Sequence, residues 1–122
     1  MSDARQQLGR RGEEVARRDL EICGYSILQA NYRVRAGEID LVTQKDGDLV
    51  FVEVRTRTGD SIGSPEESIT PWKREHLVEA AQHYLQEHGH EGRDWRIDLV
   101  AVALRPRGGI ERVDIVENAV EL

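Results

Sequence analysis

Cysteine, lysine and aromatic residues are scarce in this sequence, and long apolar runs are missing. Its one cysteine, Cys23, cannot form an internal disulfide, and its place at the end of an apolar helix face predicts a buried side chain rather than a nucleophile. No stretch approaches the roughly 18 consecutive apolar residues of a membrane-spanning helix. Residues 1–7 also lack the apolar run of a secretory signal, so we expect a cytoplasmic protein with no membrane partner.

Size and charge narrow the class of protein further. A chain of 122 residues, 39% of them hydrophobic, predicts a single domain over residues 1–122. The net charge of -6 repels a polyanion at long range, which argues against a protein that coats nucleic acid indiscriminately. Basic residues can still form local patches, and they pair at Arg10/Arg11, Arg17/Arg18, Arg33/Arg35, Arg55/Arg57 and Lys73/Arg74.

The spacing of apolar residues predicts two helices. Residues 4–23 place their apolar side chains on one side at about 100° per residue, with Ser2 or Asp3 as the N-cap. A second helix begins at Thr70-Pro71, where threonine is a favoured cap and proline a favoured first residue, and it stops at Gly89.

Segments rich in β-branched and aromatic residues predict strands over residues 25–33, 38–45, 49–58, 95–104 and 110–117. Residues 59–68 form a predicted loop of Gly, Ser, Pro and Asp that can lie over a site. The resulting order, αβββαββ, predicts the α/β class, with a mixed β-sheet flanked by helices.

A tight turn sets the register of two of these strands. Asp46-Gly47 between apolar runs is a strong signal for a two-residue hairpin. Such a turn places Lys45 opposite Asp48, Asp40 opposite Glu53 and Glu38 opposite Arg55. Residues directly opposite share a face, with Cβ atoms about 4.5 to 5.5 Å apart.

The predicted pairing brings acids together on one face of the sheet. Val50, Val52 and Val54 project to a core face, whereas Glu53 and Arg55 project to the other face with Asp40, which we expect to be unburied. Two opposed carboxylates repel, and a fold tolerates them where a cation neutralises them or one keeps its proton. Ligands that are all oxygen favour Mg²⁺ or Mn²⁺ over zinc.

The first helix supplies a third acid. Glu13 lies at the margin of the apolar stripe and can approach the sheet, whereas Glu14 points almost directly away from it.

These residues resemble a known group of enzymes. Glu13, Asp40 in Gly37–Val42 and Glu53-Val54-Arg55 in Phe51–Arg57 resemble the PD-(D/E)xK nuclease superfamily, whose core is restriction-endonuclease-like. Nearly the whole chain is similar to the YraN family of endonuclease-like bacterial proteins, related to Holliday junction resolvases. Further matching stretches are Gly12-Glu13, Asn31-Tyr32-Arg33, Lys73 and Ala81–Leu85.

The resemblance implies a Mg²⁺- or Mn²⁺-dependent nuclease that hydrolyses DNA, including structured or branched DNA. Asp40, Glu53 and the Val54 carbonyl would bind the metal, with Glu13 contributing directly or through water. The metal would lower the pKa of a bound water and stabilise charge on the phosphate. The arginines expected to contact nucleic acid are Arg33, Arg35, Arg57 and Arg74.

The sequence departs from the superfamily pattern at its last position. Arg55 stands where a lysine is expected, and arginine keeps a positive charge near the phosphate but is essentially never deprotonated. The chain has two lysines, Lys45 and Lys73, and Lys73 is the better substitute because it opens a helix after the predicted loop. Arg55 and Lys73 are therefore both candidate catalytic residues.

Several alternatives stay open. Asp40 and Glu53 could be ordinary polar residues of a solvated sheet face, and Glu13 could simply pair with Arg17. A nuclease fold that binds nucleic acid or a protein without cutting is the competing functional class, and pairing through an edge strand would make a homodimer. Trp72 either stacks on a base or, as we expect, plugs the edge of a core.

Overall fold

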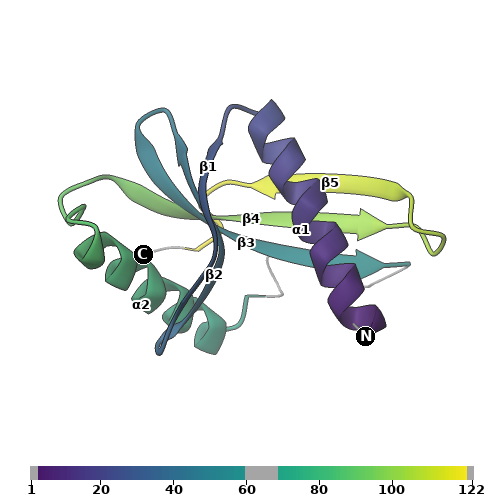
Figure 1. Ribbon diagram of the computed structural model, residues 1–122, viewed down its shortest axis with the longest axis horizontal. Helices are drawn as coiled ribbons and strands as arrows, with labels where there is room; N and C mark the ends of the chain where they lie inside the picture. The colour runs from purple at the N-terminus through teal and green to yellow at the C-terminus, as the bar shows by residue number, and fades with distance from the viewer. Residues whose placement is uncertain (1–2, 60–68, 121–122) are drawn as a thin grey trace.

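The computed structural model describes residues 3–59 and 69–120, which form an α/β fold with the order αβββαββ (Figure 1). The predicted loop over residues 59–68 lies outside the described residues except for Gly59. Neither helix of the described ranges has the length and apolar content needed to cross a membrane. The elements are α1 (Ala4–Ile22), β1 (Ser26–Val34), β2 (Gly37–Lys45), β3 (Asp48–Thr58), α2 (Pro71–Glu87), β4 (Trp95–Leu104) and β5 (Ile110–Val116).

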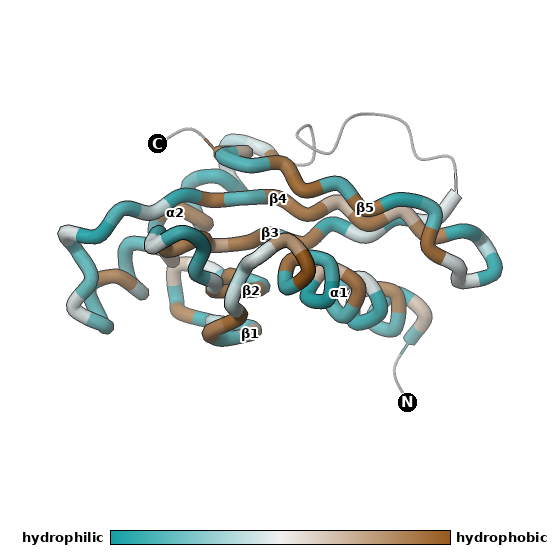
Figure 2. Tube along the Cα trace, turned by 90° about the horizontal axis from the view of Figure 1, so that it is seen from above, coloured by the Kyte–Doolittle hydropathy of each residue, from teal (hydrophilic) through white to brown (hydrophobic). Residues whose placement is uncertain are grey.

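The described strands form a five-stranded sheet in the order β1-β2-β3-β4-β5. β3 and β4 run parallel because the chain returns through α2 between them, and the other neighbours are antiparallel. The predicted mixed sheet flanked by helices is therefore confirmed. Figure 2 shows the molecule at right angles to Figure 1, with α1 on one side of β3, β4 and β5.

Helix α1 begins where the sequence predicts. The Asp3 carboxylate accepts a hydrogen bond from the Gln6 backbone N–H at 2.7 Å, which satisfies one of the free donors at the helix start. Ala16 and Leu20 are fully buried. The prediction that Cys23 is buried is wrong, because the last turn of α1 extends past the sheet and leaves Cys23 exposed.

Helix α2 also begins at its predicted cap. The Thr70 hydroxyl accepts a hydrogen bond from the Lys73 backbone N–H at 3.2 Å, and Pro71 is the first helical residue. The core face of α2 starts only at Leu77, one turn further on. Trp72 is therefore 66% exposed, and the expectation that it plugs the edge of a core is wrong.

The two helices cover opposite faces of the sheet. Val50 and Val52 pack in one buried cluster with side chains of α1, while Phe51 packs in a second cluster with side chains of α2. The Tyr84 ring of α2 meets the Phe51 ring edge-on at 5.6 Å. The face that carries Glu53 is therefore covered, and the prediction that it is unburied is wrong for Glu53, which is 4% exposed.

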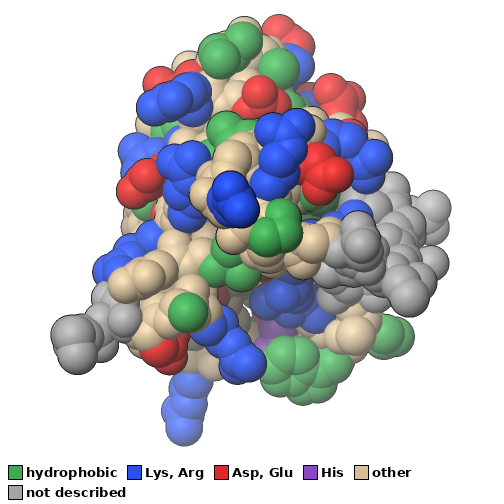
Figure 3. All heavy atoms as spheres, turned by 90° about the vertical axis from the view of Figure 1, so that its right-hand side faces the viewer, with side chains coloured by type: hydrophobic (Ala, Val, Ile, Leu, Met, Phe, Trp, Pro, Cys, Tyr) green, Lys and Arg blue, Asp and Glu red, His purple; other side chains and the backbone are tan. Residues whose placement is uncertain are grey.

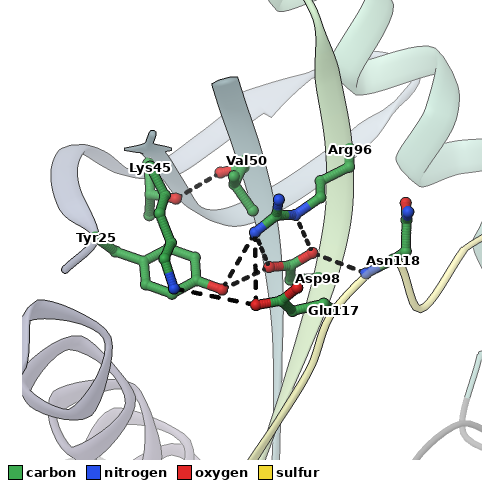
Figure 4. A network of polar contacts seen from close by, with 8 residues as sticks. Tyr25, Lys45, Val50, Arg96, Asp98, Glu117 and Asn118 are labelled. Atoms are coloured by element: carbon green, nitrogen blue, oxygen red, sulfur yellow. Dashed lines mark hydrogen bonds and ion pairs between the residues drawn. The ribbon is translucent and has the colours of Figure 1, made fainter. Parts of the chain in front are cut away.

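A buried polar network joins Tyr25, the residue before β1, to β4 and to the segment after β5 (Figure 4). Asp98 is fully buried and accepts hydrogen bonds from the Tyr25 hydroxyl at 2.8 Å, from Arg96 Nε at 3.0 Å and from the Asn118 backbone N–H at 2.9 Å. The carboxylate thus has a partner on each oxygen, as a buried charge requires.

Candidate active site

The site forms where β2 separates from β3. Asp46 and Gly47 both have positive φ, which gives the predicted two-residue turn, and the predicted register holds from Lys45–Asp48 to Leu41–Val52. The backbone pairing ends there, one position before Asp40. The Asp40 carboxylate instead accepts a hydrogen bond from the Val54 backbone N–H at 2.7 Å, so a side chain continues the contact between the two strands.

At the position where β2 separates from β3, the pairing of β2 with β1 is also irregular. Tyr32 and Ile39 lie opposite each other in the cluster under α2, whereas Ala30 and Leu41 lie opposite each other on the α1 side. Residues two apart normally share a face, so both strands change face between these pairs. Asn31, at this position in β1, has a φ of 55, a conformation that asparagine tolerates better than most residues.

Asp40 and Glu53 lie side by side. Two neighbouring carboxylates repel each other, and a proton or a cation removes this repulsion. Burial, then the charge of Asp40 and the hydrogen bond with it, raise the pKa of Glu53 to about 8, and Lys73 and Arg55 oppose this rise. The pair is thus arranged to hold one positive charge.

Lys73 reaches this pair from α2. Its ammonium nitrogen is 3.2 Å from Glu53 Oε2, an ion-pair distance. The angles of this contact do not meet those of a hydrogen bond. Glu53 Oε2 is therefore buried with no hydrogen-bond partner among the described residues. Lys45 lies elsewhere, 4.6 Å above the Tyr25 ring and 4.0 Å from Glu117. Of the two lysines, Lys73 is therefore the one that contacts the acids.

Glu13 approaches the same pair from α1. Gly12 permits this approach, because a Cβ at that position would lie 1.7 Å from the Thr56 hydroxyl oxygen of β3. Asn31 donates a hydrogen bond to Glu13 Oε1 at 3.4 Å. Burial, and secondly the charge of Asp40, raise the pKa of Glu13. Glu14 is exposed, so the two neighbouring glutamates are placed as the helix periodicity predicts.

A cleft of about 510 Å³ opens beside the acids between α1, β1, β2 and β3. Its walls carry both signs of charge, because each side supplies acidic and basic residues: Arg5, Arg10 and Glu13 from α1, and Glu38, Asp40 and Arg55 from the strands. Figure 3 shows the end of the molecule where α1 begins, with Lys and Arg side chains spread over it and several of them around a hollow. The lining side chains include Arg5, Gln6, Arg10, Glu13, Asp40 and Arg55.

Arg55 lines this cleft but does not make the predicted pair. The ion pair of Glu38 is with Arg33, at 3.2 Å, because β2 has left β3 before Glu38 can face Arg55. The Nε atom of Arg55 is buried without a hydrogen-bond partner in the described parts of the chain, and its charge helps to lower the pKa of Glu53. Arg55 is thus held close to the acid pair by the strand alone.

The four arginines expected to contact nucleic acid are dispersed. Arg33 and Arg35 lie at the exposed end of the β1–β2 hairpin, Arg57 on β3 and Arg74 on α2, and none of them lines the cleft. The basic residues that do line it, apart from Arg55, are on α1. A polar stripe at helical spacing, Gln6, Arg10 and Glu13, was the signal in the sequence that could have identified this wall.

The acid pair fits a hard divalent cation in its chemistry. Oxygen donors suit Mg²⁺ or Mn²⁺, and a buried carboxylate oxygen without a hydrogen bond, such as Glu53 Oε2, is one that such a cation satisfies. Within residues 3–59 and 69–120, no three His, Cys, Asp or Glu side chains converge closely enough to hold a metal. The structure therefore assembles two acids, with Glu13 near them and hydrogen-bonded to Asn31.

Comparison with known proteins places the chain among close relatives. Residues 12–102 match the model described as "Uncharacterised protein family UPF0102". A UPF0102 protein of Pelotomaculum thermopropionicum is 49% identical over 120 residues, 98% of this chain and 99% of the relative. Another, from Chloroherpeton thalassium, is 44% identical over 96 residues, 79% of this chain and 74% of the relative. These matches confirm the resemblance to the YraN family.

A solved structure gives a weaker likeness. The structure of Pyrococcus furiosus SfsA in complex with Ca²⁺ aligns with 96% of this chain and 65% of its own, at 14% identity and a TM-score of 0.36. A superposition this loose carries no argument about the site.

Proposed function

The chain belongs to the UPF0102 family, and we propose that it is a nuclease that uses Mg²⁺ or Mn²⁺ to hydrolyse phosphodiester bonds of DNA, including structured or branched DNA. The observation that carries the proposal is the pair of Asp40 and buried Glu53 beside a cleft that Arg5, Arg10 and Arg55 also line. A fold keeps two adjacent acids in a partly buried place at a cost in stability, and such places are often functional.

Asp40, Glu53 and the Val54 carbonyl would hold the metal, with Glu13 contributing directly or through water. When bound, the metal supplies an activated water and positive charge for the phosphate. The protein residues orient this centre: the Val54 N–H fixes the Asp40 carboxylate, and Asn31 fixes Glu13. Because the pKa of Glu53 is raised to about 8, we expect metal binding at neutral pH to displace a proton from this carboxyl group and release it.

Two cations of the protein have separate roles in this proposal. Lys73, at 3.2 Å from Glu53, is the group that can exchange a proton at the site. Arg55 keeps its charge at all relevant pH values and binds the phosphate in the cleft. In this proposal, Lys73 of α2 takes the role of the lysine that the superfamily motif has at the position of Arg55 on β3.

Calorimetric titration with Mn²⁺ tests the metal site without a guess at the substrate. We expect binding to the native chain, release of protons into the buffer, and loss of binding in Glu53→Gln. Glu14→Gln removes the same charge from an exposed position of α1 and should bind as the native chain does. Equal binding by all three proteins would refute the site.

Cleavage assays test the activity itself. In Mn²⁺, we expect the native chain to cut at least one of four DNA substrates, namely a four-way junction, a flap, a single strand and a duplex. Asp40→Asn should remove this activity. Asp46→Asn, the same change in the hairpin turn, should keep it, because asparagine also suits the positive φ there. Cleavage by Asp40→Asn at the native rate would exclude Asp40 from the mechanism.

A second function is favoured by one observation. Arg55 at the usual lysine position is typical of a weakened enzyme, and a chain with this change could bind nucleic acid or a protein partner without cutting. Arg55→Lys separates the two functions. A gain of cleavage supports an enzyme weakened at this position, whereas binding of DNA without cleavage in both proteins supports the binding module.

A further inference from the structure

Trp72 is a large apolar side chain left in solvent, and the next residue in the chain is the lysine that contacts Glu53. Trp72 is the second residue of α2 and is 66% exposed, while every fully buried large side chain of the described residues lies in the sheet or in α1. Exposure of an indole is costly, since burying an aromatic ring is strongly favourable. An exposed tryptophan therefore calls for a partner that covers it.

The ring is held in a defined orientation. Trp72 stacks against the His76 ring with centroids 3.8 Å apart and planes inclined by 30°. His76 is itself fixed, because its Nδ1 lies 2.7 Å from the Trp72 carbonyl oxygen, which can only accept a hydrogen bond. A ring that is already ordered loses little conformational entropy when a ligand stacks on it.

The position of this ring stack relative to the acids is also rigid. A Cβ at Gly37 would lie 2.9 Å from the His76 carbonyl oxygen, so the start of α2 packs tightly against the start of β2. The residue after Trp72 is Lys73, whose ammonium group is 3.2 Å from Glu53 Oε2. One helical turn thus carries both the aromatic surface and a cation that contacts the acid pair.

Such an arrangement matches the chemistry of a nucleotide. An indole stacks on any base through its π face, and neighbouring cations contact the phosphates. Bases inside a duplex are stacked on each other and cannot reach a ring on the protein surface. Lys73 and Arg74 follow Trp72 directly, so two basic residues lie on the same turn as the indole.

We propose that the Trp72–His76 ring stack binds an unpaired base, and that the substrate is a nucleic acid with at least one unstacked nucleotide next to the scissile phosphate. This inference rests on the proposed nuclease function and specifies its substrate class. Single strands, flaps and strand ends satisfy the requirement. A continuous duplex does not.

Binding measurements without metal test the proposal apart from catalysis. Fluorescence anisotropy in EDTA would use a labelled single strand, the same strand with one abasic position, and the blunt duplex. We expect Trp72→Ala to weaken binding of the single strand by about tenfold or more, since stacking contributes about 1–3 kcal/mol per base. Trp72→Phe should restore most of the affinity, and the duplex should bind equally weakly to all variants.

A matched control is available on α1. Ile22 is 76% exposed and lies at the end of α1 away from the cleft, so Ile22→Ala removes exposed apolar surface without touching the ring stack. We expect it to leave single-strand affinity unchanged. If Trp72→Ala binds the single strand as tightly as the native chain, or if it loses affinity equally for single strand and duplex, the stacking proposal is overturned.

The intrinsic fluorescence gives an independent readout. The chain has two tryptophans, so Trp95→Phe leaves Trp72 as the one indole. Addition of the single strand should quench this fluorescence, and the abasic strand should quench it less. Absence of quenching by a bound strand overturns the proposal.

The outcomes separate the two proposals. Stacking that depends on Trp72 without any cleavage in Mn²⁺ would refute the nuclease and retain the base-binding surface. Cleavage that is insensitive to Trp72 and does not require an unpaired nucleotide would retain the nuclease and refute the surface.

Discussion

Glu53 and Asp98 are buried acids on the neighbouring strands β3 and β4, and they have opposite surroundings. Asp98 lies on the α1 side of the sheet and accepts hydrogen bonds from three residues. Glu53 lies on the α2 side, next to a second acid, with one oxygen that makes no hydrogen bond in the described structure. Both carboxyl groups are removed from water, but Asp98 has hydrogen-bond donors on both oxygens, whereas Glu53 Oε2 has the ion pair with Lys73 and no hydrogen bond among the described residues.

The difference separates a structural charge from a functional one. The hydrogen bonds to Asp98 raise the pKa of Arg96, so this contact stabilises the charged form of the arginine. The pKa of Glu53 is instead raised, because burial and the charge of Asp40 disfavour its charged form when no metal is bound. For Glu53, the charges of Lys73 and Arg55 offset only part of the effect of burial and of Asp40 on its pKa.

The largest expected effect is on Asp98. Asp98→Ala leaves Arg96, the Tyr25 hydroxyl and the Asn118 N–H without their partner, so the free energy of unfolding should fall by about 3–5 kcal/mol. Urea denaturation measures it. Should Glu53→Gln prove as destabilising as Asp98→Ala, the contrast between the two acids would be wrong.

A smaller effect should follow from the helix contact that places Glu13. In Gly12→Ala, the new methyl group overlaps the Thr56 side chain, so α1 must shift and the free energy of unfolding should fall by about 1–3 kcal/mol. Gly9→Ala is the matched control on the same helix, where a Cβ meets nothing within 4 Å. It should stabilise the protein by roughly 0.5–1 kcal/mol. Equal effects of the two changes would contradict the close contact.

The pH dependence of stability should differ between the native chain and Glu53→Gln. The folded pKa of Glu53, about 8, is above the ordinary value of 4.5, so between these values the folded protein holds a proton that the unfolded chain has released. The contribution of Glu53 to the free energy of unfolding is fully present below pH 4.5 and is lost as the pH rises through 8.

Glutamine does not titrate, so Glu53→Gln should be the more stable protein above pH 8, by roughly 1–2 kcal/mol. Thermal or urea unfolding over this pH range, without divalent metal, measures the difference. Parallel curves for the two proteins would show that Glu53 has no raised pKa.

The smallest effect concerns the cation near Glu53. Lys73→Met removes a positive charge that lowers the pKa of Glu53, so this pKa should rise further. Because the Lys73 side chain is partly exposed, the change in stability should be only about 0.5–1 kcal/mol. An NMR titration of the Glu53 carboxyl carbon measures the pKa. Lys45→Met, which removes the lysine near Tyr25, should leave it unchanged.

Much of this fold could be predicted because its signals are local. Asp3 and Thr70 cap the helices at the predicted positions, and Asp46-Gly47 forms the predicted turn with its register. These features depend on hydrogen bonds and φ values of a few adjacent residues. The position of Glu13 on the inner margin of α1 followed from helical periodicity in the same way.

The errors arose where contacts are distant in sequence. The burial of Glu53 depends on α2, which begins almost twenty residues later in the chain. The sequence of β3 does not indicate which helix will cover that face of the sheet. The separation of β2 from β3 at Asp40 ended the predicted register early and removed the expected pair of Glu38 with Arg55. Trp72 was misplaced because the first turn of α2 does not pack into a core, and the buried residues of this helix begin at Leu77.

The sequence alone therefore determined the order of helices and strands, their caps, the hairpin turn and the approach of Asp40 to Glu53, because each is set by propensities and periodicity over a few residues. Only the tertiary structure decided that Lys73 contacts Glu53, that Glu53 is buried and that Trp72 is left in solvent. These outcomes depend on how α2 packs across the sheet, and such packing is a balance of many weak contacts between residues far apart in the chain.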